Sequence, residues 1–315
     1  MFKKILLLNF DKTALKPEHW RRIDAISKEK ILLNADSSDV KKHLATTDCL
    51  FLKVGMGADK TFIDTMPHLT YIGVFGTAFG HINTTYAAKK GIAVCNIAGY
   101  STESVAEFVF GALLEHIREI TRAKIQAKTG NYSESSYTGT EIKGKTFGVI
   151  GLGNIGKRVA EIAEKGFGAN VLYWSHKRKK EAEKIGIKYT KVDTLLKTSD
   201  IISLHISFNS ETKGFLNTKR IAMIKSGAIV INTAPMELID IPALETRLKK
   251  GDMTFILDHS DELDPKDAKR LSKYKNCILY PPIAYTTKEA TNLKQEIFIS
   301  NLENFLKGKP TNKIN

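Results

Sequence analysis

The feature that most limits the fold of this chain is a regular alternation between short apolar runs and amphipathic helical stretches. The first set of apolar runs lies at 3–8, 30–34, 48–52, 70–75 and 91–95. The second set lies at 146–150, 170–174, 187–190, 200–204, 228–232, 254–258 and 277–280. Strands that alternate with helices form mostly parallel sheets that are covered by helices on both faces. The pattern therefore predicts an α/β protein.

The two sets of runs predict two α/β units, which fits a length of 315 residues. Between the sets lies the clearest helical pattern of the chain, residues 101–127, with apolar side chains at i, i+3 and i+4 spacing. A polar connection rich in glycine and serine follows it at 128–144. A last helical pattern covers 288–308 and ends at a Gly-Lys-Pro sequence.

Composition narrows the class of protein. No apolar stretch is long enough to cross a bilayer, so we expect no membrane partner. The formal net charge is +14, but the lysines are scattered, which favours a solvated surface and makes nucleic-acid binding an unlikely use of the charge. The three cysteines, Cys49, Cys95 and Cys277, are far apart and suggest neither a disulfide framework nor a CxxC metal site. A cytoplasmic location is the simplest expectation.

A glycine-rich turn follows the apolar run at 146–150. Gly151, Gly153 and Gly156 have the GxGxxG spacing, and Asn154 and Ile155 open the helical pattern that comes next. In such a strand–turn–helix unit the first glycine permits a tight turn, the second lets the backbone approach a pyrophosphate, and the third lets the helix pack on the sheet. The helix N-terminus offers unpaired N–H groups to the phosphates. The turn predicts a dinucleotide-binding site.

The residues after the next strand indicate which dinucleotide is preferred. Sites for NAD carry an Asp or Glu about 20 residues beyond the glycines, where it binds the ribose 2′-hydroxyl. This chain has Ser175, His176, Lys177 and Arg178 at that place, so no carboxylate repels a 2′-phosphate. A hydroxyl and two positive charges favour NADP(H) over NAD(H).

With these motifs in place, the chain resembles the D-2-hydroxyacid dehydrogenase family over nearly its whole length. The resemblance rests on four segments: 73–114, 144–160, 200–217 and 223–234. The stretch 175–178 is similar to that of the NADP-preferring glyoxylate and hydroxypyruvate reductases of the family. Members commonly form homodimers through the region of the helix at 101–127.

The resemblance implies two doubly wound parallel-sheet domains. A Rossmann cofactor domain at 99–287 would be inserted in a flavodoxin-like substrate domain made of 1–98 and 288–315. It also implies three further cofactor contacts, at His205, Thr233 and Asp258.

The family transfers a hydride between a nicotinamide and C2 of a 2-oxo or 2-hydroxy acid. An Arg grips the substrate carboxylate, a His donates the proton, and a Glu supports that His. In this sequence the Arg position is Pro235 and the His position is Pro282, and proline has no titratable group. The loop at 258–264 is one residue longer than the family's, so that either Glu262 or Asp264 takes the place of the Glu.

Three interpretations of these departures remain. In the first, the protein reduces a 2-oxo acid or related carbonyl with relocated groups. Lys53 and the substrate loop Val54, Gly55, Met56 and Gly57 would then anchor the anion, and the candidate proton donors are His259, Tyr285, His81 and Tyr100, with Glu262 in support. In the second, the protein is a cofactor-binding pseudoenzyme, a sensor or a partner-binding module. The third interpretation, a metal site in the acidic loop at 258–264, has the least support.

Overall fold

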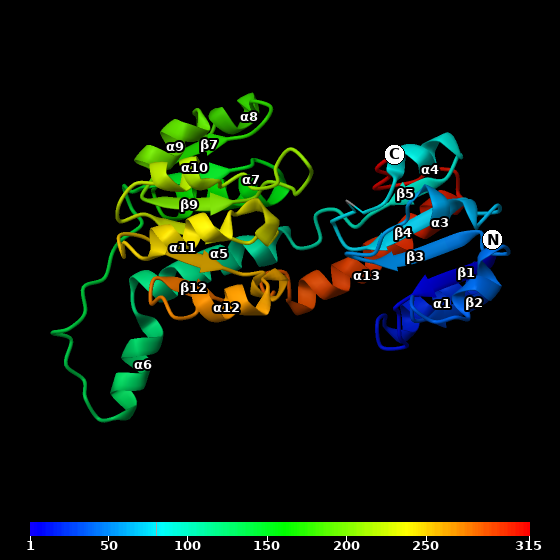
Figure 1. Cartoon of the computed structure of the whole chain (residues 1–315), viewed down its shortest axis with the longest axis horizontal. Coiled ribbons are helices and arrows are strands. Elements are labelled where there is room, and N and C mark those ends of the chain that lie inside the picture. Colours follow the sequence, from blue (N-terminus) through cyan, green and yellow to red (C-terminus); the bar gives the residue numbers. More distant parts are fainter. Residues whose placement is uncertain (80) are drawn as a thin grey trace. The chain divides into compact units, whose positions relative to one another are not determined.

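The computed structural model describes residues 1–79 and 81–315, and its chain forms two compact units. Unit 1 consists of Met1–Tyr100 and Thr287–Asn315, and unit 2 consists of Ser101–Thr286. Each unit is built around its own parallel sheet with helices on both faces (Figure 1). The predicted fold class, two doubly wound α/β domains, is confirmed.

Unit 1 contains a five-stranded sheet in its described part, with the strand order β2-β1-β3-β4-β5. The strands are β1 Phe2–Leu8, β2 Ser27–Leu33, β3 Cys49–Lys53, β4 Tyr71–Phe75 and β5 Ala93–Cys95. The helices are α1 Pro17–Ala25, α2 Val40–Leu44, α3 Lys60–Asp64, α4 Thr84–Lys89 and α13 Lys288–Leu306. This is the flavodoxin-like order, and it reverses direction between β1 and β3.

The sheet of unit 1 is buried on both faces because successive side chains of each strand point to opposite sides. Leu6 and Leu50 face one apolar cluster, while Ile5 and Phe51 face the other. The second cluster includes Phe298 of α13, whose ring centroid lies 4.5 Å from that of Phe51. The C-terminal helix therefore completes the core of the N-terminal sheet.

Unit 2 contains a seven-stranded sheet in its described part, with the order β12-β11-β10-β9-β6-β7-β8. The strands are β6 Thr146–Ile150, β7 Asn170–Trp174, β8 Lys188–Tyr189, β9 Ile201–Leu204, β10 Ile229–Asn232, β11 Thr254–Leu257 and β12 Cys277–Leu279. The helices are α5 Thr102–Ile117, α6 Ile120–Lys128, α7 Asn154–Glu161, α8 Lys180–Glu183, α9 Val192–Thr198, α10 Thr218–Met223, α11 Ile241–Leu248 and α12 Pro265–Leu271.

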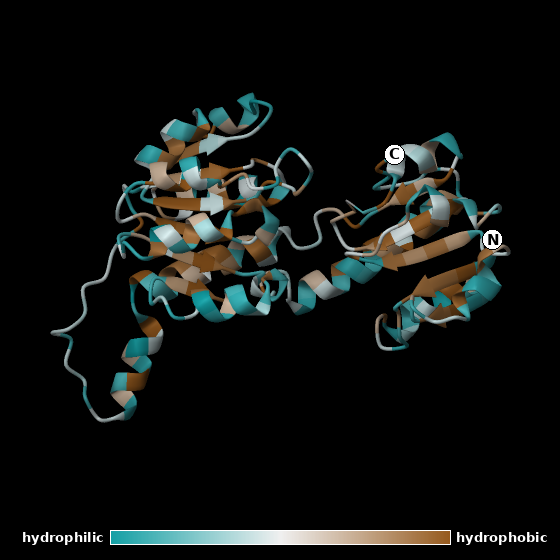
Figure 2. Cartoon of the chain, in the orientation of Figure 1, coloured by the Kyte–Doolittle hydropathy of each residue, from teal (hydrophilic) through white to brown (hydrophobic). Residues whose placement is uncertain are grey.

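Short turns of other helical types also occur in unit 2, a π-helical turn at Ile162–Gly166 and 3₁₀ turns at Met236–Leu238 and Ser260–Glu262. The order of its sheet is that of a Rossmann fold and reverses between β6 and β9. Helices α5 and α7 pack on one face of the sheet, and α9, α10 and α11 pack on the other. In Figure 2 the strands are mainly hydrophobic, whereas the solvent-facing sides of the helices are hydrophilic.

The expected single helix at 101–127 is wrong in one respect, because the structure has two helices there. Helix α5 ends at Ile117 and α6 begins at Ile120. Between them Glu119 adopts a left-handed backbone conformation with φ of 51°, which stops the i to i−4 ladder. Helix α6 has no buried residue and projects from the rest of unit 2 (Figure 1).

No helix in the described ranges is long and apolar enough to cross a membrane. The three cysteines are unpaired and buried. Burial raises the pKa of the Cys277 thiol to about 12, so this thiol is a core side chain rather than a nucleophile.

Candidate cofactor and catalytic site

The glycine turn lies where the sheet order of unit 2 reverses, between the carboxyl ends of β6 and β9. Gly151 has φ of +96°, and a Cβ placed there would lie 2.7 Å from the backbone of His205. A Cβ on Gly156 would overlap the carbonyl oxygen of Gly151. Both glycines are therefore required by the fold itself, because no other residue fits.

Gly153 is different, because nothing in the chain requires it to be glycine. Its φ is −78°, an ordinary value, and a Cβ added there would meet no atom within 4 Å. It is the N-cap residue of α7, and the backbone N–H groups of Asn154 and Ile155, in the first turn of this helix, have no partner within the helix. This geometry fits the close approach of a pyrophosphate to a helix N-terminus.

His205 follows β9 on the other side of the reversal. Its Nε2 lies 2.8 Å from the Oγ of Ser203, which fixes the orientation of the imidazole. Burial lowers the pKa of His205 to about 3, so the ring is neutral at physiological pH. A neutral imidazole beside the glycine turn adds no charge next to the predicted phosphate site.

Two buried polar atoms without partners lie at the ends of β10 and β11. The Oγ1 of Thr233 and the Oδ2 of Asp258 have no hydrogen-bond partner among the described residues, although Asp258 is only 1% exposed. Its backbone N–H bonds to the carbonyl oxygen of Asn232, which joins the two strand ends. Leaving such atoms unpaired is costly unless a ligand completes them. A carboxamide could satisfy both atoms, so these residues fit a nicotinamide.

The 175–178 stretch presents fewer free positive charges than its sequence suggests. The hydroxyl of Ser175 donates to the carbonyl of Lys177 at 2.6 Å. The guanidinium of Arg178 is held by both oxygens of Glu183, at 2.7 and 2.6 Å, and stacks on a neighbouring tyrosine ring. His176 packs on Trp174. Lys177 is the exposed cation of the stretch that forms no ion pair in the described part of the chain.

After β10 the chain turns back through the segment at 232–236, which has no charged side chain. The side chain of Asn232 accepts from the N–H of Ala234 and donates to its carbonyl, which folds the backbone back on the strand. Pro235 then starts a 3₁₀ turn with φ of −52°. The N–H of Met236 donates to Oε2 of Glu262 at 2.8 Å. The Glu262 carboxylate therefore fastens the backbone beside Pro235.

The acidic loop after β11 places an imidazole between carboxylates. The Nδ1 of His259 lies 3.4 Å from Oε1 of Glu262, and its Nε2 lies 3.8 Å from Oδ2 of Asp258. Asp264 instead caps α12, so Glu262 is the residue that pairs with the histidine. Burial raises the pKa values of the Asp258 and Glu262 carboxyls. A cation beside these carboxyl groups would favour their ionised forms.

The segment that contains Pro282 is tied to the same loop. The Oδ1 of Asp258 accepts from the N–H groups of Ile283 and Ala284, at 3.0 and 3.2 Å. The ring of Tyr285 stacks on that of His259 with 6.1 Å between the centroids and 20° between the planes. Burial raises the pKa of the Tyr285 phenol, and nearby carboxylates raise it further. The structure therefore brings together His259, Glu262 and Tyr285 of the predicted set.

The other candidates belong to unit 1. Lys53 is the last residue of β3, and its Nζ lies 5.8 Å from the ring centroid of Phe10. The substrate loop at 54–57 continues from it and is joined to His81 by a hydrogen bond from the N–H of Ala58 to the His81 carbonyl. The ring centroid of Tyr100 lies 5.4 Å from the Nζ of Lys294.

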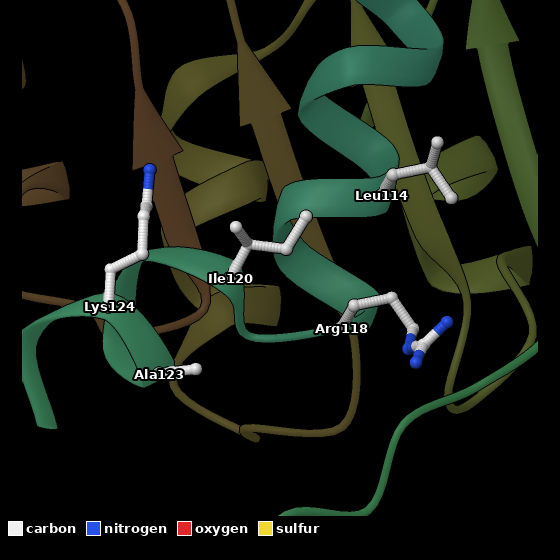
Figure 3. Close-up of a pocket in the computed structure, with 5 residues that line it drawn as sticks. All are labelled: Leu114, Arg118, Ile120, Ala123 and Lys124. Atoms are coloured by element: carbon white, nitrogen blue, oxygen red, sulfur yellow. The ribbon is translucent and has the colours of Figure 1, made fainter. Parts of the chain in front are cut away.

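A cavity of about 500 Å³ opens beside the junction of α5 and α6 (Figure 3). It is lined by Leu114, Arg118, Ile120, Ala123 and Lys124. Its position is remote in sequence from the glycine turn and from the acidic loop, and it contains no carboxylate or imidazole among its lining side chains. No group of three or more His, Cys, Asp or Glu side chains in residues 1–79 and 81–315 is arranged to hold a metal ion.

Comparison with known proteins connects this geometry to a family. The model of the D-isomer specific 2-hydroxyacid dehydrogenase NAD-binding domain matches residues 110–284. A glyoxylate reductase of Thermococcus litoralis is 36% identical over 278 residues, covering 85% of this chain and 83% of the relative. The chain belongs to the D-isomer specific 2-hydroxyacid dehydrogenase family.

Other relatives and solved structures agree with this family. A hydroxypyruvate reductase of Blautia hydrogenotrophica is 30% identical over 307 residues and covers 94% of both chains. An acyclic imino acid reductase solved with NADPH and D-Arg superposes with a TM-score of 0.87 at 29% identity, covering 99% of this chain and 100% of that one. The D-lactate dehydrogenase of Aquifex aeolicus, solved with NAD and lactic acid, gives a TM-score of 0.84 at 28% identity, with 97% and 96% coverage.

Family membership supports NAD(P)-dependent 2-hydroxyacid dehydrogenase or reductase activity and a nicotinamide cofactor. The matched NAD-binding model lies within unit 2, which holds the glycine turn and the two unpaired polar atoms.

Two residues of interest escaped the sequence reasoning. Glu183, which holds Arg178, lies in a helical stretch among other charged residues, and its spacing of five from Arg178 gave no signal. Lys294 lies on α13, 241 residues after Lys53, yet the positive charge of Lys53 adds to burial in lowering the pKa of Lys294. Only the tertiary fold brings these partners together.

Proposed function

We propose that this protein is an NAD(P)H-dependent reductase that transfers a hydride to C2 of a small 2-oxo acid or related carbonyl, with His259 as the relocated proton donor. The observation that carries the proposal is the pair of His259 and Glu262, 3.4 Å apart, on the loop that holds the unpaired oxygen of Asp258. An imidazole next to a carboxylate is the acid–base pair that this reaction requires.

The bound nicotinamide would supply the hydride. The residues of the chain would do the rest. Thr233 and Asp258 would orient the carboxamide through their unpaired oxygens. Glu262 would hold Nδ1 of His259, so that Nε2 can give its proton to the substrate oxygen as the hydride reaches C2. Lys53 and the loop at 54–57 would bind the substrate anion, because Pro235 cannot.

The test is NADPH oxidation, followed by absorbance, across a panel of 2-oxo acids and simple aldehydes. We expect turnover by the wild type and a loss of about 10²–10⁴-fold in His259→Asn. The Pro235→Arg/Pro282→His double substitution is measured in parallel. Turnover by that variant alone would favour the pseudoenzyme interpretation, in which the protein binds the cofactor without using it. Unchanged turnover in His259→Asn would refute the assigned donor.

A second candidate function is the reduction of a carbon–nitrogen double bond. Asp258 and Glu262 have raised pKa values and form no ion pair with a Lys or Arg among the described residues, so the loop favours a cation. A protonated imine carries its own proton, and hydride addition yields the amine without an acid. A structural neighbour is an acyclic imino acid reductase. Pyruvate with and without ammonium separates the two functions, because only imine reduction needs ammonium and yields alanine.

We propose further that the cofactor is NADP(H) in preference to NAD(H). The absence of a carboxylate at 175–178 and the exposed Lys177 support this preference, and Arg178 would join if a 2′-phosphate displaced Glu183. Lys177→Met should weaken NADPH binding about tenfold and leave NADH binding unchanged. Lys184→Met is the matched control, since Lys184 is also an exposed lysine nearby but pairs with Glu181. Equal losses for both cofactors would contradict the preference.

We also propose a homodimer formed through α6 and the cavity beside it. Ile120 and Ile125 of this helix are 42% and 61% exposed, which is unusual for large apolar side chains on a helix that buries none of its own residues. Ile125→Lys should convert the dimer to a monomer in size-exclusion chromatography with light scattering. Leu293→Lys, at a similarly exposed leucine on α13, is the control. A monomeric wild type would refute the dimer.

A further inference from the structure

Unit 1 carries two lysines without an anionic partner near the point where the order of its sheet reverses. Lys53 ends β3, and Phe10 follows β1, and these are the two strands between which the order changes direction. Ligands of doubly wound sheets bind outside the carboxyl ends of the strands at this point. The glycine turn occupies the equivalent place in unit 2, and in unit 1 this place holds Lys53 and the start of the loop at 54–57.

The second lysine reaches this region from the C-terminal helix. The Nζ of Lys294 lies 4.3 Å from the ring centroid of Phe75, the last residue of β4. The rings of Phe75 and Phe10 are in edge contact at 5.4 Å, so the rings below Lys294 and Lys53 form one apolar floor. The two ammonium groups therefore lie over two rings that contact each other, although 241 positions separate the lysines in the sequence.

Neither lysine forms an ion pair within residues 1–79 and 81–315, whereas Lys4, Lys30 and Lys90 of the same unit do. The Asp11 carboxylate accepts hydrogen bonds from the N–H and hydroxyl of Thr13, at 2.7 and 2.5 Å. These bonds lower the pKa of Asp11, and the charge of Lys53 lowers it further. Burial lowers the pKa of Lys294, and the charge of Lys53 lowers it further. Two like charges on an apolar floor are stabilised when an anion joins them.

We propose that Lys53 and Lys294 form a binding site for a small oxyanion, and that its ligand is the carboxylate of the substrate. This deepens the proposed reductase function, on which it rests, because it names the side chains that would bind the substrate carboxylate. A carboxylate and an inorganic phosphate are both oxyanions, and either can accept charged hydrogen bonds from two ammonium groups. The aromatic floor favours a ligand whose remaining atoms are few and apolar, such as a short 2-oxo acid.

The alternative is that both lysines only rest their apolar stems on the rings, as lysines often do at surfaces. Lys60 provides the matched control for that role. It belongs to the same unit and is exposed, and its Nζ lies 5.6 Å from the ring centroid of Tyr86, over which Lys90, paired with Asp64, also lies. Replacing Lys60 removes a cation from an aromatic ring without touching the pair.

The experiment is isothermal titration calorimetry of the full-length protein, without cofactor, with sodium pyruvate and separately with sodium phosphate at constant ionic strength. We expect Lys294→Met and Lys53→Met each to weaken pyruvate binding about tenfold or more, because a charged hydrogen bond is lost. Lys60→Met should bind as the wild type does, and Lys294→Arg should retain most of the affinity. Thermal melts verify that each variant is folded.

The outcomes separate the ligand, the site and the reaction. Tighter binding of phosphate than of pyruvate, with the same dependence on Lys294, would support the oxyanion site but assign it to phosphate. Equal pyruvate affinity in Lys294→Met and wild type, or no binding of either anion by the wild type, would overturn the site. If Lys294-dependent binding is found but no substrate of the panel is reduced, the reductase proposal fails and the site stands. If reduction proceeds with an unchanged KM in Lys294→Met, the site fails and the reductase stands.

Discussion

The Glu262→Gln substitution tests the proposed acid–base pair without disturbing the loop around it. The amide of glutamine has nearly the same shape as the carboxylate, and its oxygen can still accept from the N–H of Met236, which Oε2 accepts from at 2.8 Å. What disappears is the negative charge 3.4 Å from Nδ1 of His259. The substitution therefore isolates the electrostatic support of the imidazole.

The size of the effect follows from this distance. Two unit charges 3.4 Å apart interact by about 1 kcal/mol in bulk water and about 5 kcal/mol at an effective dielectric constant near 20. The Glu262 side chain is 32% exposed, so solvent screens part of the interaction. A value of about 2 kcal/mol corresponds to a loss of roughly thirtyfold in rate.

The assay is steady-state NADPH oxidation with whichever substrate of the panel the wild type reduces. Because Glu262 acts through His259, kcat should fall while the KM for NADPH stays the same. Asp261→Asn is the matched control. Asp261 is an exposed carboxylate on the same 3₁₀ turn, and it forms no ion pair with His259 among the described residues. Removing its charge should change kcat by less than about threefold. An unchanged kcat in Glu262→Gln, or equal losses in both variants, would refute the reasoning.

Two further predictions concern the cofactor turn and the stability of unit 1. Gly156→Ala should lower the melting temperature, because the added Cβ overlaps the carbonyl oxygen of Gly151. Gly153→Ala should melt at the same temperature as the wild type, but its NADPH affinity in a fluorescence titration should be about tenfold weaker. Arg22 bonds to Glu296 and Glu303 and lowers both carboxyl pKa values, that of Glu296 to about 2. Depressed carboxyl pKa values stabilise the fold above the unfolded value near 4.3, and this stability is lost as the pH falls towards about 2. Urea midpoints should decline over that interval in the wild type and decline less in Arg22→Met, and parallel declines would contradict the assignment.

The sequence by itself determined the fold class, the family and the place of the glycine turn. These depend on local patterns, namely strand-length apolar runs, helical periodicity and glycine spacing next to a strand. The break between α5 and α6 was missed because the apolar pattern continues to Ile120, while the left-handed backbone of Glu119 is not required by its residue type. A periodic pattern indicates which face is buried, but it does not exclude a change of direction within a helix.

The chemistry of the site was decided by the tertiary structure. Sequence reasoning named His259, Glu262 and Tyr285 separately, but only the folded loop places the imidazole against the carboxylate and the phenol ring. Arg178 was counted as a free cation until the fold paired it with Glu183, five residues away. Side-chain contacts of this kind depend on how loops and helices pack, which no local pattern encodes. For that reason the sequence predicts two vacant family positions at Pro235 and Pro282 and names candidate replacements, while the arrangement of those candidates and the position of Lys294 came from the structure.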